Sequence, residues 1–132
     1  MDTSEKYIKM CEKAEEIQKN HEWKYGDFFV LVRPQYLERI VFLVWNESTV
    51  IQRNEIAIWL SRQDQLQEMA NTKWPWPMYL FRFYEFIQQE YLYNAEEWKP
   101  IADYSMEQLW LAFVMKEKFG KTWDDEKGEM IS

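Results

Sequence analysis

The longest apolar run of the chain is Leu109–Met115, in which all seven consecutive residues are apolar. A helix that is apolar on every side must be covered on most of its surface by the rest of the protein. Ser105 and Gln108 precede this run and are three residues apart, which is the spacing of a capping box. In a capping box two side chains accept hydrogen bonds from the free backbone N–H groups at the start of a helix. Gly120 follows it, and glycine commonly ends a helix in the left-handed conformation. The pattern therefore predicts a buried helix over Met106–Phe119.

Apolar residues at three- and four-residue spacing predict further helices. One covers about Thr3–Asn20 and another about Met78–Tyr91. A shorter helix is expected after Ser61, which would act as its N-cap and place Arg62 in the first turn. For the start of the helix over Met78–Tyr91, a strand over Tyr79–Phe83 is the alternative, because runs of aromatic residues are ambiguous.

Short runs rich in β-branched and aromatic residues occupy the middle of the chain: Phe28–Arg33, Arg39–Trp45 and Glu55–Leu60. Turn-forming residues separate these runs, which predicts an antiparallel meander. The runs are almost continuously apolar and do not alternate. Either both faces of the sheet are covered, or one face meets a partner.

These elements predict a single α+β domain over residues 1–132. In this fold a small antiparallel sheet packs against a central buried C-terminal helix, and the N-terminal and middle helices flank it. The last residues are expected to form a hairpin that turns at Lys127-Gly128 and brings Trp123 near Met130 or Ile131.

The aromatic content of 18% exceeds what one small core needs. We interpret the excess as a face for a partner or for self-association, and the alternative is a core that uses Trp and Tyr in place of Leu. The net charge of −7 disfavours a protein that binds the phosphate backbone of nucleic acids. An acidic imitation of nucleic acid would need clustered carboxylates, whereas acidic and basic residues are mixed along most of this sequence.

The sequence contains no recognisable catalytic or metal-binding motif. Cys11 is the only cysteine and lies on the apolar stripe of the first helix, where an inert thiol is expected. His21 is the only histidine and has no Asp or Ser at motif spacing, so we expect it to end a helix. A glycine-rich phosphate loop is absent. We therefore predict a protein that is not an enzyme, with no catalytic residue, no metal site and no cofactor.

A pair of tryptophans supplies the candidate binding residues. Trp74 and Trp76 are each followed by a proline, which holds the tryptophan in an extended conformation. The two rings could stack on a base, a nucleotide or a proline-rich partner, or they could brace the linker against the core. Tyr79, Arg82 and Arg62 complete the candidate set, the two arginines as contacts for a phosphate.

The start of the chain, Met1–Met10, is polar and lacks the apolar segment of a signal peptide. No apolar run approaches the roughly 18 residues that span a bilayer. A cytoplasmic location without membrane contact is expected.

Three stretches resemble short hypothetical proteins encoded in phages and prophages of Gram-positive, Clostridium-like bacteria: Lys6–Gln18 (KYIKMCEKAEEIQ), Ile58–Met69 (IWLSRQDQLQEM) and Ser105–Gly120 (SMEQLWLAFVMKEKFG). The resemblance runs over most of the chain and rests on helix caps and core residues. Ser61 departs from it, because a proline is expected after Trp-Leu, and this affects only the cap. The resemblance implies a genomic setting, and no functional residue is carried over from it.

Small phage accessory proteins often bind a host protein or sequester a signalling nucleotide of host defence. The resemblance thus implies a non-catalytic accessory protein in the bacterial host cell that acts by protein contact, on a host factor or as a homodimer. A nucleotide-binding sponge with an aromatic pocket and an acidic mimic of nucleic acid are the alternatives.

Overall fold

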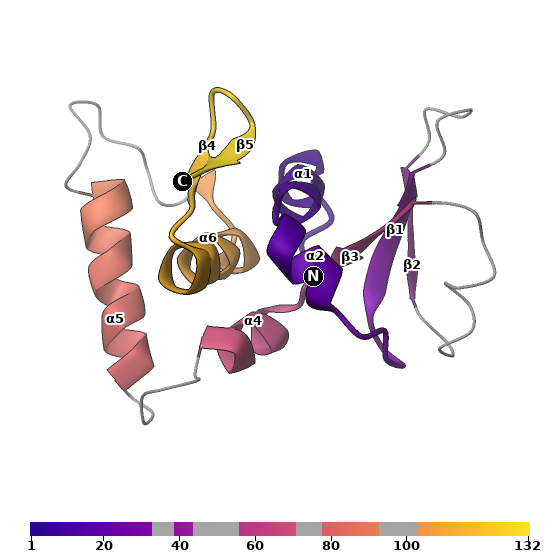
Figure 1. The fold of residues 1–132 in the computed structure, drawn as a ribbon, viewed down its shortest axis with the longest axis horizontal. Helices are drawn as coiled ribbons and strands as arrows, with labels where there is room; N and C mark the ends of the chain where they lie inside the picture. Colours follow the sequence, from indigo (N-terminus) through magenta and orange to yellow (C-terminus); the bar gives the residue numbers. More distant parts are fainter. Residues whose placement is uncertain (33–38, 44–55, 71–77, 93–102) are drawn as a thin grey trace.

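The computed structural model describes residues 1–32, 39–43, 56–70, 78–92 and 103–132 (Figure 1). Within these ranges the fold is α+β, as predicted. The helices are α1 (Glu5–Lys13), α2 (Glu15–Asn20), α4 (Gln63–Ala70), α5 (Met78–Ile87) and α6 (Met106–Phe119), with a π-helical turn η1 (Gln88–Leu92) directly after α5. The strands are β1 (Phe28–Val32), β2 (Arg39–Leu43), β3 (Ile56–Leu60), β4 (Thr122–Asp124) and β5 (Glu129–Ile131).

Helix α6 forms the centre of the molecule, and its predicted bounds are confirmed (Figure 1). All residues from Gln108 to Met115 are buried. The hydroxyl of Ser105 accepts a hydrogen bond from the Gln108 backbone N–H at 3.1 Å, which is one half of the expected capping box. The other half is not formed, because Oε1 of Gln108 has no hydrogen-bond partner in the described structure, while Nε2 of the same side chain donates to Asp2 at 2.9 Å. Asp2 also accepts a hydrogen bond from the Ser105 hydroxyl, so it links the N-terminal segment to the start of α6.

Gly120 ends α6 in the left-handed conformation, with φ at 65° and ψ at 25°. Its N–H bonds the carbonyl of Lys116, and the next N–H bonds the carbonyl of Met115, so the last turn is closed by a glycine cap. A methyl group added at Gly120 would meet no atom within 4 Å, so only the backbone conformation opposes a larger residue.

Gly120→Ala is therefore expected to lower the free energy of unfolding by about 1–2 kcal/mol, because alanine is strained at this φ. Urea denaturation measures the change. Gly120→Asn is the matched control, since asparagine tolerates the left-handed region better. An alanine variant as stable as the asparagine variant would contradict this explanation.

The predicted N-terminal helix is divided in two at Ala14, whose ψ of 65° is not helical. The N–H of Ala14 still bonds the carbonyls of Met10 and Cys11, so α1 closes before α2 begins. Tyr7, Met10, Cys11, Ala14 and Ile17 are buried, as the stripe predicted. The break redirects α2, so that its last residues reach the sheet.

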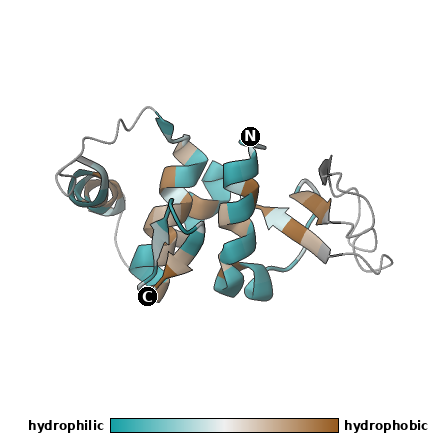
Figure 2. Cartoon of the chain, turned by 90° about the horizontal axis from the view of Figure 1, so that it is seen from above, coloured by the Kyte–Doolittle hydropathy of each residue, from teal (hydrophilic) through white to brown (hydrophobic). Residues whose placement is uncertain are grey.

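The three-stranded sheet has the order β2-β1-β3, with β1 antiparallel to both neighbours. A simple meander would place β2 in the middle, so the prediction of a meander is wrong in its strand order. Alternation of residues cannot reveal this order, because any antiparallel arrangement of three apolar strands buries the same side chains. In Figure 2 the strands of this sheet are coloured mostly as hydrophobic, whereas the helices carry both colours.

Helix α1 lies between the three-stranded sheet and α6 (Figure 1). Val30, Ile58 and Leu60 of the sheet belong to the same buried core as Trp110 and Phe113 of α6. The opposite face of the sheet carries Phe29 and Leu31, which are also buried. Both faces of the sheet are therefore covered at these central residues, which is one of the two predicted alternatives.

The C-terminal hairpin forms as predicted, with Trp123 opposite Met130. Asp125 fixes it to the rest of the protein by accepting hydrogen bonds from Trp123 Nε1 at 2.7 Å and from the hydroxyl of Tyr104. Lys6 of α1 forms an ion pair with Asp125 at 3.2 Å and lies over the Tyr104 ring. No helix in the described part of the chain combines the length and apolar character needed to cross a bilayer.

Candidate functional site

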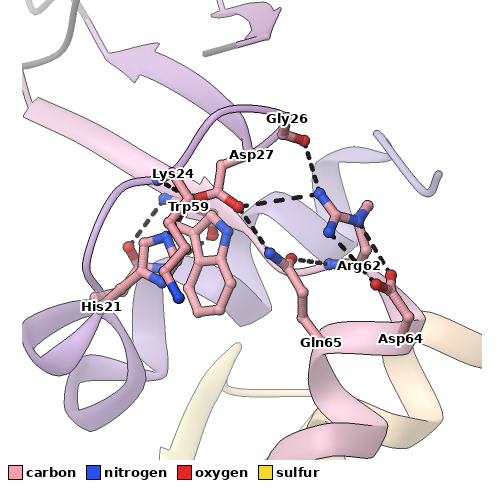
Figure 3. A network of polar contacts seen from close by, with 9 residues as sticks. His21, Lys24, Gly26, Asp27, Trp59, Arg62, Asp64 and Gln65 are labelled. Carbon is pink, nitrogen blue, oxygen red and sulfur yellow. Dashed lines mark hydrogen bonds and ion pairs between the residues drawn. The ribbon is translucent and has the colours of Figure 1, made fainter. Parts of the chain in front are cut away.

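A buried carboxylate, Asp27, organises a polar network at the base of the three-stranded sheet (Figure 3). Only 2% of its side chain is exposed. It accepts hydrogen bonds from His21 Nε2 at 2.7 Å, from the Lys24 backbone N–H at 2.8 Å and from Gln65 Nε2 at 2.7 Å. The guanidinium of Arg62 lies 3.9 Å away. A buried carboxylate with this many donors is a fixed structural anchor.

The imidazole of His21 lies flat on the indole of Trp59, with ring centroids 3.4 Å apart and an angle of 7° between the rings. Burial lowers the pKa of His21, and the hydrogen bond with Asp27 opposes this effect. Because the Asp27 carboxylate accepts, we assign the proton of the neutral ring to Nε2. Nδ1 is then an acceptor, and it has no hydrogen-bond partner in the described part of the chain.

The pairing of His21 with Asp27 was not predicted from the sequence, in which no Asp lies at motif spacing from the histidine. His21 does end a helix as predicted, as the C-cap of α2. The two residues are six positions apart on an irregular turn, a spacing that belongs to no recognised motif. The only local signal was Gly26, whose φ of 91° allows the turn that brings Asp27 back towards His21.

Gln18 fixes the position of Trp59 through the backbone. Its amide oxygen accepts from the Trp59 N–H at 2.9 Å, and its amide nitrogen donates to the Trp59 carbonyl at 2.9 Å. Strand β3 is at the edge of the sheet, so this side chain occupies backbone groups that another strand would otherwise pair with. Helix α2 thus both covers the sheet edge and holds the ring on which His21 stacks.

Beside the stacked rings lies a hollow of about 510 Å³, which we call the α2–α4–α6 hollow. Its apolar lining is supplied by Ile17, Trp59, Met69 and Phe119. Its polar lining is supplied by Glu16, Asn20, His21, Glu22, Lys24, Gln65, Glu68 and Lys118. A concave surface with an aromatic wall and several convergent polar groups is typical of a small-molecule site.

The chemically reactive side chains that line the hollow are carboxylates, two lysines and one histidine. The lining contains no serine, threonine, cysteine or tyrosine. Cys11 lies elsewhere in the core, and its burial raises the thiol pKa to about 12. Within the described residues no group of three or more His, Cys, Asp or Glu side chains is arranged to hold a metal ion.

The predicted binding residues are placed at different parts of the structure. Trp74 and Trp76 lie outside the described residues. Tyr79 of α5 is half-buried, with its ring centroid 6.0 Å from that of Trp110. Arg82 of α5 bonds Glu117 of α6 at 3.0 Å.

Arg62 is not in the first turn of α4 but at its N-cap. Its carbonyl accepts from the Leu66 N–H, and its own N–H donates to the Gln65 side chain at 2.9 Å. Its guanidinium bonds the Gly26 carbonyl at 2.7 Å and Asp64 at 3.0 Å. The predicted cap, Ser61, is buried, and its hydroxyl has no hydrogen-bond partner in the described structure. The guanidinium therefore ties α4 to the turn before β1.

The outer side of α5 carries a second candidate surface. Met78, Phe81 and Tyr84 are 45%, 59% and 56% exposed, and we call these three side chains the α5 ridge. The core side of the same helix carries Phe83 and Phe86, which are buried. An ordinary surface helix has polar residues where this helix has the ridge.

Comparison of the chain with known protein families, with curated proteins and with solved structures finds no match. The hollow and the ridge are the two candidate binding surfaces among the described residues.

Proposed function

We propose that this chain is a non-catalytic binding protein that acts through contact with another protein, and that the α5 ridge is its contact surface. The observation that carries the proposal is the exposure of two aromatic rings and a methionine on the side of α5 that faces away from the core. Aromatic residues and methionine are enriched in protein interfaces, and grouped exposed apolar residues mark such surfaces.

The spacing of the ridge supports contact through a helix face. Residues three positions apart lie on neighbouring turns of one side of a helix, so Met78, Phe81 and Tyr84 form a continuous strip. The hydroxyl of Tyr84 accepts a hydrogen bond from Gln88 at 2.8 Å, which holds this ring in place along the helix. A helix presents such anchors when it docks against another helix or into a groove.

A second copy of this chain is the partner that fits the ridge best. The whole chain carries a net charge of −7, so two copies repel one another at most orientations. Helix α5 contains one basic and one acidic residue, Arg82 and Glu85, and is therefore neutral. A two-fold contact between α5 helices would bury apolar side chains of both copies at the least electrostatic cost.

Light scattering coupled to size-exclusion chromatography tests this proposal. The unaltered chain is expected to be a concentration-dependent dimer, and the double variant Phe81→Ser, Tyr84→Ser is expected to weaken dimerisation about tenfold or more, because central aromatic residues dominate interface energies. Tyr25→Ser is the matched control, since Tyr25 is 71% exposed on the turn before β1 and away from α5.

Three results would overturn the proposal. They are a monomer at every concentration, a dimer that the double variant leaves unchanged, and equal weakening by Tyr25→Ser. Circular dichroism of each variant confirms that its fold is retained, which is expected because the replaced side chains are exposed.

The genomic setting implied by the sequence resemblance, a phage or prophage accessory protein acting on a host factor, stays a prediction. The acidic-mimic alternative gains no support from the described residues, because many of their carboxylates are paired with bases. These pairs are Lys6–Asp125, Arg62–Asp64, Arg82–Glu117, Lys116–Glu90 and Lys121–Glu16.

A further inference from the structure

The outer side of α5 changes in character along the helix. The ridge residues Met78, Phe81 and Tyr84 occupy its first two turns. The exposed side chain of Glu85 follows on the same side, one turn after Phe81. Helix α5 lies at the outer edge of the molecule with α6 on its inner side, so a second molecule can reach this surface (Figure 1). The ridge is therefore bordered by a carboxylate at its C-terminal end.

Glu85 is the charged residue of α5 that forms no ion pair within the described residues. The other one, Arg82, bonds Glu117 of α6 at 3.0 Å. In the π-helical turn that follows, Glu90 forms an ion pair with Lys116 of α6 at 3.5 Å. Both of these pairs join the α5 segment to α6 within one chain. The outer side of α5 thus presents one carboxylate per molecule without a partner of opposite charge.

The start of α5 lacks the negative charge that a helix N-terminus favours. The free N–H groups of a first turn carry a partial positive charge, which an acidic side chain stabilises. The first turn of α5 contains no acidic residue. Residues 71–77, which precede it, contain none either. Helix α5 therefore has a positive end without compensation, and Glu85 lies roughly 10 Å further along the axis.

A two-fold contact through the ridge can place the two α5 helices parallel or antiparallel. In a parallel contact each residue meets its own copy, so the two Glu85 carboxylates would lie side by side and repel one another. In an antiparallel contact centred on Phe81, Met78 faces Tyr84. Each Glu85 then lies beside the first turn of the other helix, whose partial positive charge attracts it. The charges of α5 therefore favour the antiparallel contact.

We propose that two copies of this chain dock with their α5 helices antiparallel, with Phe81 at the two-fold axis and Glu85 of each copy at the N-terminal end of the other α5. This inference rests on the homodimer proposed for the α5 ridge, and it adds the orientation and the residue that selects it. The contact is the same on both copies and closes on itself, so it gives dimers and no longer assembly.

Glu85→Gln tests the proposal through the dissociation constant of the dimer, measured by light scattering over a range of concentrations. It is expected to weaken the dimer about three- to tenfold, because two attractions between a carboxylate and a helix end are lost. The matched control is Glu126→Gln, on the exposed turn of the C-terminal hairpin. Both variants remove one negative charge and so reduce the general repulsion equally, and the control is not expected to weaken the dimer.

Cysteine cross-linking measures the orientation independently. Cys11 is 1% exposed and its burial raises the pKa of the thiol to about 12, so it does not compete at about pH 8. A mixture of Met78→Cys and isotope-labelled Tyr84→Cys is expected to form the mixed disulfide on mild oxidation. Glu85→Cys is expected to form little disulfide with itself, since the two positions are roughly 12 Å apart along the helix axes.

The outcomes separate this inference from the proposed function. A tighter dimer with Glu85→Gln, or a rapid disulfide in Glu85→Cys, would show a parallel contact and overturn the inference while the ridge dimer stands. Equal effects of Glu85→Gln and Glu126→Gln would show that Glu85 does not select the orientation. An unaltered chain that stays monomeric at every concentration would overturn the inference together with the proposed function.

Discussion

Trp110→Ala is expected to lower the free energy of unfolding by about 3–5 kcal/mol, the usual cost of removing a buried aromatic side chain. Trp110 is 1% exposed, and its ring stacks on that of Phe83 with centroids 3.8 Å apart. Phe113 also contacts it edge-on. The ring thus joins α6 to α5. Its loss would leave a cavity between the two helices that small shifts of α5 and α6 could not fill. Urea denaturation followed by circular dichroism measures the change.

Two further variants separate the cavity from other effects. Trp110→Phe retains a ring for stacking and deletes an indole N–H that has no acceptor in the described structure, so a cost of about 1 kcal/mol is expected. Met106→Ala lies on the same helix with 46% of the methionine exposed, and it should change stability by less than about 0.5 kcal/mol. A cost for Trp110→Ala near that of Met106→Ala would contradict the central role of the ring.

Asp27→Asn is expected to destabilise the protein by about 2–3 kcal/mol, although it changes the side-chain volume very little. The carboxylate accepts from His21, Lys24 and Gln65. An asparagine has one acceptor oxygen, and its NH₂ group would face a donor of one of these partners. A buried donor is then left unpaired, and that costs more than the net gain from one hydrogen bond.

Asp64→Asn is the control for this result, because Asp64 also interacts with Arg62 while 68% of its side chain is exposed. An exposed ion pair contributes little, so a change below about 1 kcal/mol is expected. Thermal and urea denaturation of both variants test the difference. Equal effects at Asp27 and Asp64 would show that burial and multiple donors do not make Asp27 an anchor.

The prediction for α6 was accurate because each of its signals is local. The cap at Ser105, the apolar run and the glycine at position 120 lie within one segment, and backbone hydrogen bonding acts over the same range. The division of the N-terminal helix at Ala14 was not predictable in this way. Alanine favours helix, so the break reflects the packing of α2 against β3 and not a local preference.

In the candidate site, too, the residue types follow from the sequence but their arrangement depends on tertiary packing. Glu16, His21 and Glu68 are unremarkable in the sequence, because surface helices commonly carry such residues. They line one hollow only because α2, with the residues after it, and α4 lie beside the end of α6. Tyr79, Arg82 and Arg62 were chosen for their chemistry, yet the structure pairs them with Trp110, Glu117 and Gly26, partners that are 31, 35 and 36 residues away.

The sequence by itself determined the α+β class, the central buried helix, the apolar strands and the C-terminal hairpin, because these follow from patterns within one or two adjacent elements. Only the tertiary structure decided the strand order, the burial of Asp27 beside His21, the exposure of the α5 ridge and the hollow between α2, α4 and α6. Those features depend on contacts between distant segments, whose free energies are set by packing and by the pairing of buried polar groups. The spacing of residues along the chain does not predict these contacts.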